Sequence, residues 1–321
     1  MPNICQVSLY GNLPIIIENI NKFEKFYQDN IFYIICPKKE KKFFLRKLKY
    51  KNVKVFEEEN LIKFSKFKKI SNKYLKKKKY FNKIQKRLTW YYQQILKLSF
   101  VIDFSKKNKE NIIIWDADTI LIKKINFFNK KYSYYYGTTS YSHKAYYSTN
   151  DYILNGLPKY FISSLAQFIA ITPLEIQFLV KLLNKKKNKL ISTGEWLTHV
   201  IMKSVTIAHN TYNGSMFSEY ELIGQSNLKL NYKRQILISG LRDHLNGKLT
   251  YFQIKILEIL GFKYIAYEHT HSNNNSRNML SRNQSWRKFL YLLLKKQTNN
   301  MFRGAKHHVF YTLNFFKPTK W

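Results

Sequence analysis

The sequence is poor in acidic residues and cysteine, and it has no long apolar run. Among its 321 residues are 56 Lys and Arg but only 19 Asp and Glu, a formal net charge of +37. The two cysteines, Cys5 and Cys36, are too few for a disulfide framework and lack metal-ligand spacing, so we expect buried thiols in a reducing cytoplasm. No stretch has the length needed to cross a bilayer, and no basic-then-apolar leader is present, so we expect neither a membrane span nor a signal peptide.

The basic excess indicates an anionic partner, such as a nucleic acid, an anionic lipid surface or phosphorylated small molecules. The chain is also rich in Lys, Asn, Ile, Tyr and Phe, which is typical of AT-rich coding, so part of the charge has a compositional explanation. Lysine far outnumbers arginine, which is the better residue for bidentate contacts with phosphates and bases. We therefore expect no specific nucleic-acid partner.

The segment Asn111–Leu121 is the most informative stretch. Its apolar run of three isoleucines and a tryptophan predicts a central strand buried on both faces. The run ends in Asp116-Ala117-Asp118, and two carboxylates at the tip of a buried strand are costly unless a positive charge lies between them. A divalent cation fits, because hard cations bind carboxylate oxygens and leave room for phosphate oxygens. The alternative is a strand that ends in an ordinary polar turn.

Strand-like segments alternate with longer mixed segments, which predicts an α/β fold with a mostly parallel central sheet flanked by helices. The lysine-dense stretch Lys63–Lys86, including Lys76–Lys79, is typical of a solvated face or a mobile loop. Residues 1–272 are expected to form one domain, and 273–321 a basic, aromatic C-terminal extension with an amphipathic segment at Trp286–Lys296. The expected strands are Asn3–Tyr10, Ile31–Cys36, Asn52–Phe56, Asn111–Trp115, Tyr132–Tyr136, Leu165–Ile171, Gln235–Ile238 and Lys263–Tyr267.

The expected helix Leu88–Phe104 places Trp90, Gln93, Gln94 and Lys97 on one face, at positions i, i+3, i+4 and i+7. Apolar residues on another face, Tyr91, Ile95 and Leu98, can pack on the sheet. Glutamine both donates and accepts hydrogen bonds, and lysine can meet a phosphate, so the polar face is a candidate binding surface. The alternative is an ordinary amphipathic helix.

Three motifs together resemble a bacterial family of glycosyltransferase-like proteins catalogued as a domain of unknown function. They are Trp-X-X-Gln-Gln-X-X-Lys at Trp90–Lys97, Asp-X-Asp-Thr at Asp116–Thr119, and Ser-Glu-Tyr-Glu-X-X-Gly at Ser218–Gly224. One departure is the segment Leu165–Ile171, which carries Gln167 and no histidine. The resemblance implies a GT-A-like, Rossmann-like fold that uses a nucleotide-sugar donor and a divalent metal, Mn²⁺ or Mg²⁺. Such folds bind ligands at the carboxyl ends of their strands, where Asp116 and Asp118 are expected.

The resemblance also suggests roles for individual residues. Asp118 is the first candidate for a metal ligand, Asp116 for a metal ligand or a contact to donor sugar or ribose, and His269 for a late third ligand. Trp90, Gln93, Gln94 and Lys97 are candidates for donor binding, and Trp115 or a nearby tyrosine could stack on the base. Candidates for the catalytic base are Glu195, Glu219 and Glu221, because an inverting transfer needs a carboxylate near the attacking hydroxyl.

The expected function is transfer of a sugar to a saccharide or lipid-linked acceptor, in bacterial surface polysaccharide synthesis. We expect a cytoplasmic protein that contacts the anionic inner membrane face peripherally through Lys76–Lys79 and Trp286–Lys296. Two alternatives stay open. A nucleotidyl or phosphoryl transferase could use the same two-carboxylate metal chemistry, although no P-loop is present. A basic RNA- or membrane-binding protein without catalysis would leave both the Asp-X-Asp and the helix motif unexplained.

Overall fold

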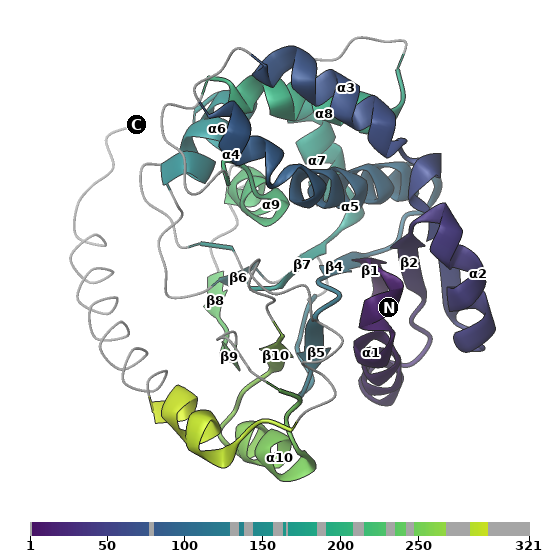
Figure 1. Cartoon of the computed structure of the whole chain (residues 1–321), viewed down its shortest axis with the longest axis vertical. Helices are drawn as coiled ribbons and strands as arrows, with labels where there is room; N and C mark the ends of the chain where they lie inside the picture. The colour runs from purple at the N-terminus through teal and green to yellow at the C-terminus, as the bar shows by residue number, and fades with distance from the viewer. Residues whose placement is uncertain are drawn as a thin grey trace.

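A five-stranded sheet with the order β3-β2-β1-β4-β7 forms the centre of the molecule (Figure 1). The first four strands in this order pair in parallel, and β7 pairs antiparallel to β4. The prediction of a mostly parallel sheet in an α/β fold is therefore confirmed. The strands are β1 (Asn3–Val7), β2 (Phe32–Cys36), β3 (Val53–Glu57), β4 (Ile112–Trp115) and β7 (Phe168–Ile171).

The computed structural model describes residues 2–76, 80–128, 135–137, 144–156, 163–164, 166–184, 191–207, 215–228, 235–241, 247–267 and 283–294. Every residue of β1, β2, β4 and β7 is buried. This agrees with their continuous apolar sequences, which are typical of strands covered on both faces. Cys5 and Cys36 are buried free thiols in β1 and β2, as expected.

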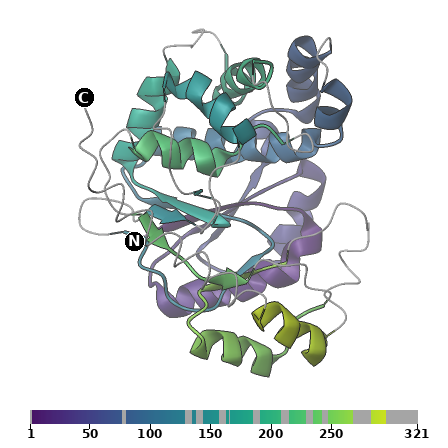
Figure 2. The ribbon, with the colours of Figure 1, turned by 90° about the vertical axis from the view of Figure 1, so that its left-hand side faces the viewer.

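Helices cover both faces of this sheet (Figures 1 and 2). One apolar cluster joins one face to α3 and α5–α9, and a second joins the other face to α1 and α2. The bounds are α1 (Leu13–Phe26), α2 (Lys38–Lys47), α3 (Phe64–Leu75), α4 (Phe81–Gln85), α5 (Leu88–Lys107), α6 (Lys144–Leu154), α7 (Pro173–Asn184), α8 (Thr193–Val205) and α9 (Glu219–Leu228). Two 3₁₀ turns, Tyr10–Asn12 and Glu58–Asn60, follow β1 and β3.

Two smaller sheets lie beside the central one. In the first, β10 (Tyr264–Ala266) runs antiparallel to β5 (Thr119–Leu121) and parallel to β9 (Gly240–Leu241). In the second, β6 (Tyr135–Gly137) pairs with β8 (Gln235–Leu237). The end of the molecule below β5 and β10 in Figure 1 is formed by α10 (Tyr251–Ile259) and the helical segment 286–294.

Of the two interpretations of the lysine-dense stretch, a solvated face or a mobile loop, the first agrees with the structure over residues 64–75. Residues 64–75 form α3, whose Phe67, Ile70 and Leu75 are buried, so the lysines occupy the solvent side of an amphipathic helix. Residues 77–79 lie outside the described residues, as does the predicted domain boundary at 272/273. Within the described residues, no helix combines the length and apolar character needed to span a membrane.

Candidate active site

The turn after β4 is fixed by hydrogen bonds to its backbone. The Asp116 N–H donates to the Gln167 carbonyl at 3.0 Å, and the Thr119 N–H donates to the Asp116 carbonyl at 3.1 Å. Gln167 has a φ of +64°, a left-handed conformation that is uncommon for a residue with a side chain. The chain therefore makes a tight turn between β4 and β5, with Asp116 at the carboxyl end of a parallel strand.

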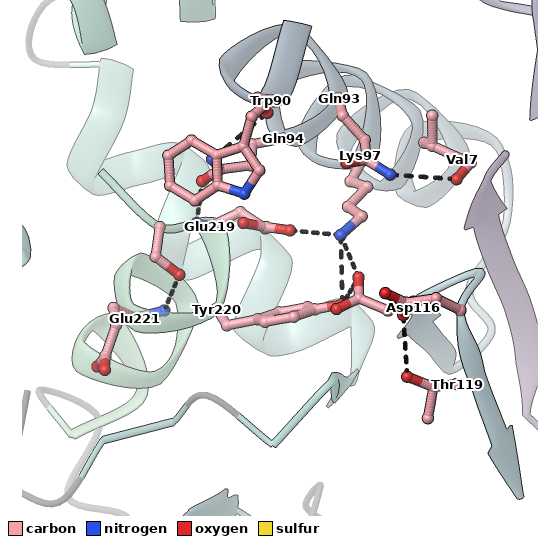
Figure 3. Close-up of polar contacts among 12 residues, drawn as sticks. Val7, Trp90, Gln93, Gln94, Lys97, Asp116, Thr119, Glu219, Tyr220 and Glu221 are labelled. Atoms are coloured by element: carbon pink, nitrogen blue, oxygen red, sulfur yellow. Dashed lines mark hydrogen bonds and ion pairs between the residues drawn. The ribbon is translucent and has the colours of Figure 1, made fainter. Parts of the chain in front are cut away.

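The Asp116 carboxylate receives two hydrogen bonds on the same oxygen. Lys97 Nζ donates to Oδ1 at 2.5 Å, and the Tyr220 hydroxyl donates to Oδ1 at 2.6 Å (Figure 3). None of the described residues bonds Oδ2. Lys97 lies on α5 and Tyr220 on α9, so two helices distant in sequence converge on the end of β4.

Glu219 completes this cluster. Its Oε1 accepts a hydrogen bond from Lys97 Nζ at 2.7 Å, and its backbone N–H donates to Gln94 Oε1 at 3.1 Å. Lys97 Nζ also lies 3.3 Å from the Tyr220 hydroxyl. The side chains of Lys97 and Glu219 are each 4% exposed, whereas that of Asp116 is 20% exposed. The ion pairs are thus buried, with Asp116 as the member that reaches the surface.

One ammonium faces two carboxylates in this cluster. Burial alone would lower the pKa of Lys97, but Asp116 and Glu219 together outweigh it and raise the pKa above its ordinary value. Burial raises the pKa of Glu219, and the Asp116 charge adds to that effect while Lys97 opposes it. Burial, with the same negative charges, also raises the pKa of the Tyr220 phenol. Lysine and tyrosine therefore both carry the protons they donate to Asp116 at neutral pH.

Asp118 lies in the same turn, two residues after Asp116. Its Oδ1 accepts a hydrogen bond from Thr119 Oγ1 at 3.2 Å, and its backbone carbonyl accepts one from the Tyr267 N–H at 2.8 Å. His269, the predicted third metal ligand, lies outside the described residues. Within the described ranges, no three His, Cys, Asp or Glu side chains are grouped so that they could hold a metal ion.

The predicted polar face of α5 is turned toward this edge of the sheet. Gln93 Nε2 donates to the Val7 carbonyl, at the carboxyl end of β1, at 3.3 Å, and Gln94 and Lys97 meet α9 as described. Trp90 is partly buried, and the Arg87 guanidinium lies 4.6 Å from its ring centroid. The prediction that these four residues share one face is confirmed, while their roles stay predictions.

The predicted stacking role of Trp115 is wrong, while the candidate bases Glu221 and Glu195 lie apart from the Lys97 cluster and their roles stay predictions. Trp115 is fully buried against Phe23 and Phe168, so it cannot stack on a nucleobase. Glu221 is fully buried and bonded to Ser163 and to Gln225, and its side chain points away from Lys97 (Figure 3).

Glu195 also lies apart from the cluster. It forms an ion pair with Lys66 of α3 at 3.5 Å, and nearby Thr193 donates to Asp103, which lies almost two helical turns beyond Lys97 on α5. Glu195 therefore belongs to the packing of α8 on α3, where His199 also bonds Tyr74 at 3.0 Å.

The sequence interpretation gave no role to Tyr220, which proved to be a central contact of Asp116. Its position between the two acids of the Ser-Glu-Tyr-Glu motif was the available signal. A buried tyrosine needs a partner for its hydroxyl, and a neighbouring carboxylate site is a natural one.

The fold and these residues define an α/β protein with a carboxylate-rich site at the carboxyl end of a parallel strand. The chain belongs to a family of unknown function (DUF6492), whose profile matches residues 7–244 and therefore includes all three motifs. The family prediction is thereby confirmed. No curated protein matches the sequence.

Several solved glycosyltransferases are similar in shape. The galactosyltransferase LgtC, in complex with donor and acceptor sugar analogues, is 6% identical with a TM-score of 0.40, covering 90% of this chain and 94% of its own. Mouse xyloside xylosyltransferase 1, in its apo form, is 9% identical with a TM-score of 0.38, covering 86% and 98%. The glycosyltransferase GlyE of Streptococcus pneumoniae TIGR4 is 11% identical with a TM-score of 0.34, covering 92% of this chain and 64% of its own. At TM-scores below 0.5, these similarities assign no activity to this chain.

Proposed function

We propose that this protein is a metal-dependent glycosyltransferase, which moves a sugar from a nucleotide-sugar donor to a saccharide or lipid-linked acceptor. The observation that carries the proposal is the placement of Asp116 and Asp118 at the carboxyl end of β4. Open α/β sheets bind their ligands at this edge. A nucleotide diphosphate brings two adjacent negative charges, which carboxylates can accommodate only together with a cation.

The residues present fit a hard divalent cation, Mn²⁺ or Mg²⁺. Asp118 would be the principal ligand, and Asp116 has Oδ2 available for the metal or for a sugar hydroxyl. The proposal keeps His269 as a third ligand, and the bond from the Tyr267 N–H to the Asp118 carbonyl supports it, because it holds the chain beside Asp118 two residues before His269. A bound cation would stabilise the charge that develops on the leaving diphosphate.

The contacts of α5 and α9 divide the other candidate residues by role. Lys97 and Tyr220 hold Asp116 in one orientation, and Gln94 fixes the start of α9 through the Glu219 N–H. Trp90 and Gln93 are the members of the α5 face that lie outside the ion-pair cluster, so they remain the candidates for contacts with the donor. A base must be able to take up a proton near the site, and Glu219, with its raised pKa, is the candidate that meets both conditions.

The proposed setting is bacterial surface polysaccharide synthesis at the cytoplasmic face of the membrane. The basic character of the chain supports peripheral contact with anionic lipid, which would bring the site close to a lipid-linked acceptor.

A thermal-shift panel of nucleotide sugars, with and without Mn²⁺, tests the proposal, and transfer to water or to an acceptor is then measured for each stabilising donor. We expect one donor class to raise Tm only when Mn²⁺ is present. Asp118→Asn should abolish this shift and Mn²⁺ binding in calorimetry, while Asp103→Asn, an exposed carboxylate on α5, should retain both. Full activity after treatment with EDTA would refute the metal's role. Nucleotide hydrolysis without any sugar preference would favour a nucleotidyl or phosphoryl transferase.

A further inference from the structure

An apolar surface covers one end of the molecule, remote from α3 and α5–α9. It is formed by α10 and the segment 286–294, which lie side by side in both views (Figures 1 and 2). Gln253 Nε2 of α10 donates to the Gln284 carbonyl at 3.0 Å, and Leu257 and Phe289 belong to one buried cluster. The two segments are therefore packed together as one unit.

Large apolar side chains project from this unit into solvent, with relative exposures from 44% to 81%. We name them the end surface: Tyr251, Phe252, Ile259, Leu260, Trp286, Leu290 and Tyr291. Scattered exposed apolar residues are normal in proteins, but a concentration on two adjacent segments marks an interaction site.

The segment 286–294 carries large apolar side chains on its covered side and also on its exposed side. Phe289, Leu292 and Leu293 are buried against α10 and its neighbours, while Trp286 and Tyr291 face outward. Arg287 and Lys288 lie among the outward side chains, and such a mixture of large apolar and basic residues is typical of a helix that lies at an interface. Here one side is covered by this chain, which leaves the other for a partner.

Basic residues accompany these apolar side chains. The described ranges 247–267 and 283–294 contain one acidic residue, Glu258, whose Oε2 lies 2.8 Å from Lys255 Nζ. The same ranges contain the basic residues Lys248, Lys255, Lys263, Arg287 and Lys288. The partner that complements this surface is therefore apolar and anionic.

We propose that the end surface docks on an anionic lipid bilayer. Tryptophan and tyrosine favour the interface between headgroups and acyl chains, and lysine or arginine beside them binds anionic headgroups. A protein partner, including a second copy of this chain, would have to match the basic residues with an acidic patch, and this chain has 19 acidic residues against 56 basic ones. The bilayer supplies both the apolar layer and the negative charge.

The location of the end surface connects it to the candidate site. Strand β10 lies between the two, since it pairs with β5, and the Tyr267 N–H that follows it bonds the Asp118 carbonyl. A protein docked by this end would hold its carboxylate site at a fixed height above the lipid. The use of a lipid-linked acceptor rests on the proposed function, whereas the docking itself does not.

Cosedimentation of the full chain with vesicles tests the docking. We compare vesicles of phosphatidylcholine alone with vesicles that also contain phosphatidylglycerol. The wild-type protein should bind the anionic vesicles about tenfold or more tightly than the neutral ones, and added salt should weaken that binding. The double variant Phe252→Ser, Tyr291→Ser should bind anionic vesicles about tenfold or more weakly than the wild type. Both side chains would otherwise be buried in the lipid interface.

Matched controls distinguish binding through the end surface from binding through overall charge or through exposed apolar residues elsewhere. The double variant Leu45→Ser, Leu174→Ser, whose residues are 51% and 57% exposed on α2 and α7, should bind as the wild type does. The double variant Arg287→Gln, Lys288→Gln should bind anionic vesicles about tenfold more weakly than the wild type and neutral vesicles equally well.

Three results would overturn the docking proposal. They are equal binding to both vesicle types, retained binding by the Phe252 and Tyr291 variant, and a wild-type dimer in light scattering that this variant dissociates without any vesicle binding. Asp118→Asn should bind vesicles as the wild type does, so the docking can be tested even if the protein lacks the proposed enzyme activity. Conversely, a wild-type protein that transfers sugar to a soluble acceptor but does not bind vesicles would contradict only the docking proposal.

Discussion

Replacement of Lys97 with methionine is the most direct test of the ion-pair cluster. Methionine keeps most of the length and the apolar stem of lysine but removes the ammonium that lies 2.5 Å from Asp116 and 2.7 Å from Glu219. Two carboxylates would then remain close together with no cation between them, and one of them is almost fully buried. The neutral hydroxyl of Tyr220 would be the remaining donor to Asp116.

The expected cost follows from the burial of the pair. Removing one partner of a buried ion pair typically destabilises a protein by about 3–5 kcal/mol, since it leaves an uncompensated charge. Glu219 can reduce that cost by taking up a proton. The loss of stability in Lys97→Met should therefore be largest at neutral pH and smaller at acidic pH, and adding Glu219→Gln should recover about 1–3 kcal/mol of it.

Urea unfolding followed by circular dichroism measures these differences. Lys106→Met is a matched control, because Lys106 lies on the same helix and also pairs with a carboxylate at 2.7 Å, but its side chain is 54% exposed. We expect this control to cost about 0.5 kcal/mol or less. A Lys97→Met variant that unfolds at the same urea concentration as Lys106→Met would refute the inference that the cluster is held together by its buried charge.

Three further predictions concern the neighbouring residues. Tyr220→Phe removes the hydroxyl from Asp116, so it should cost about 1–2 kcal/mol in urea unfolding and weaken the metal-dependent donor shift more than the fold. Glu195→Gln breaks a partly exposed pair with Lys66, so it should change stability by less than about 1 kcal/mol and leave transfer activity within about twofold, and a large loss of activity would support Glu195 as the base. Burial raises the pKa of Glu219 above 4.5, so the folded protein binds a proton that the unfolded chain has released. The free energy of unfolding should therefore fall as pH rises from about 4.5 through the folded pKa, and Glu219→Gln should flatten this decline in a pH series of unfolding curves.

The strand that ends in Asp-X-Asp could be predicted because its local sequence agrees with its position in the fold. Continuous isoleucines favour a strand covered on both faces, and a sudden pair of acids marks its end. Helix α7 also begins at a local sequence signal, because the Thr172 N–H donates to the Glu175 carboxylate at 2.5 Å and the Glu175 N–H donates to Thr172 Oγ1 at 3.4 Å.

The partners of Lys97 could not be predicted from the sequence. The helical spacing of α5 placed Lys97 on the correct face, and a lysine on such a face is an ordinary candidate for binding phosphate. Its actual partners come from β4 and from α9, and Glu219 lies 122 residues away in the sequence. Local periodicity carries no information about which distant element a side chain meets.

The two acids of the Ser-Glu-Tyr-Glu motif show how the choice of secondary structure decides which residue can act. On a strand, Glu219 and Glu221 would point to the same side, and both could face a ligand. The motif instead begins α9, where residues two apart are separated by about 200° around the helix axis. Glu219 then faces Lys97, while Glu221 turns into the packing of α9, where it accepts a hydrogen bond from Ser163. Because Glu219 is the acid of this motif that contacts Lys97, it stays the candidate base of our proposal, and a substitution of Glu221 that inactivates the protein should do so by unfolding it.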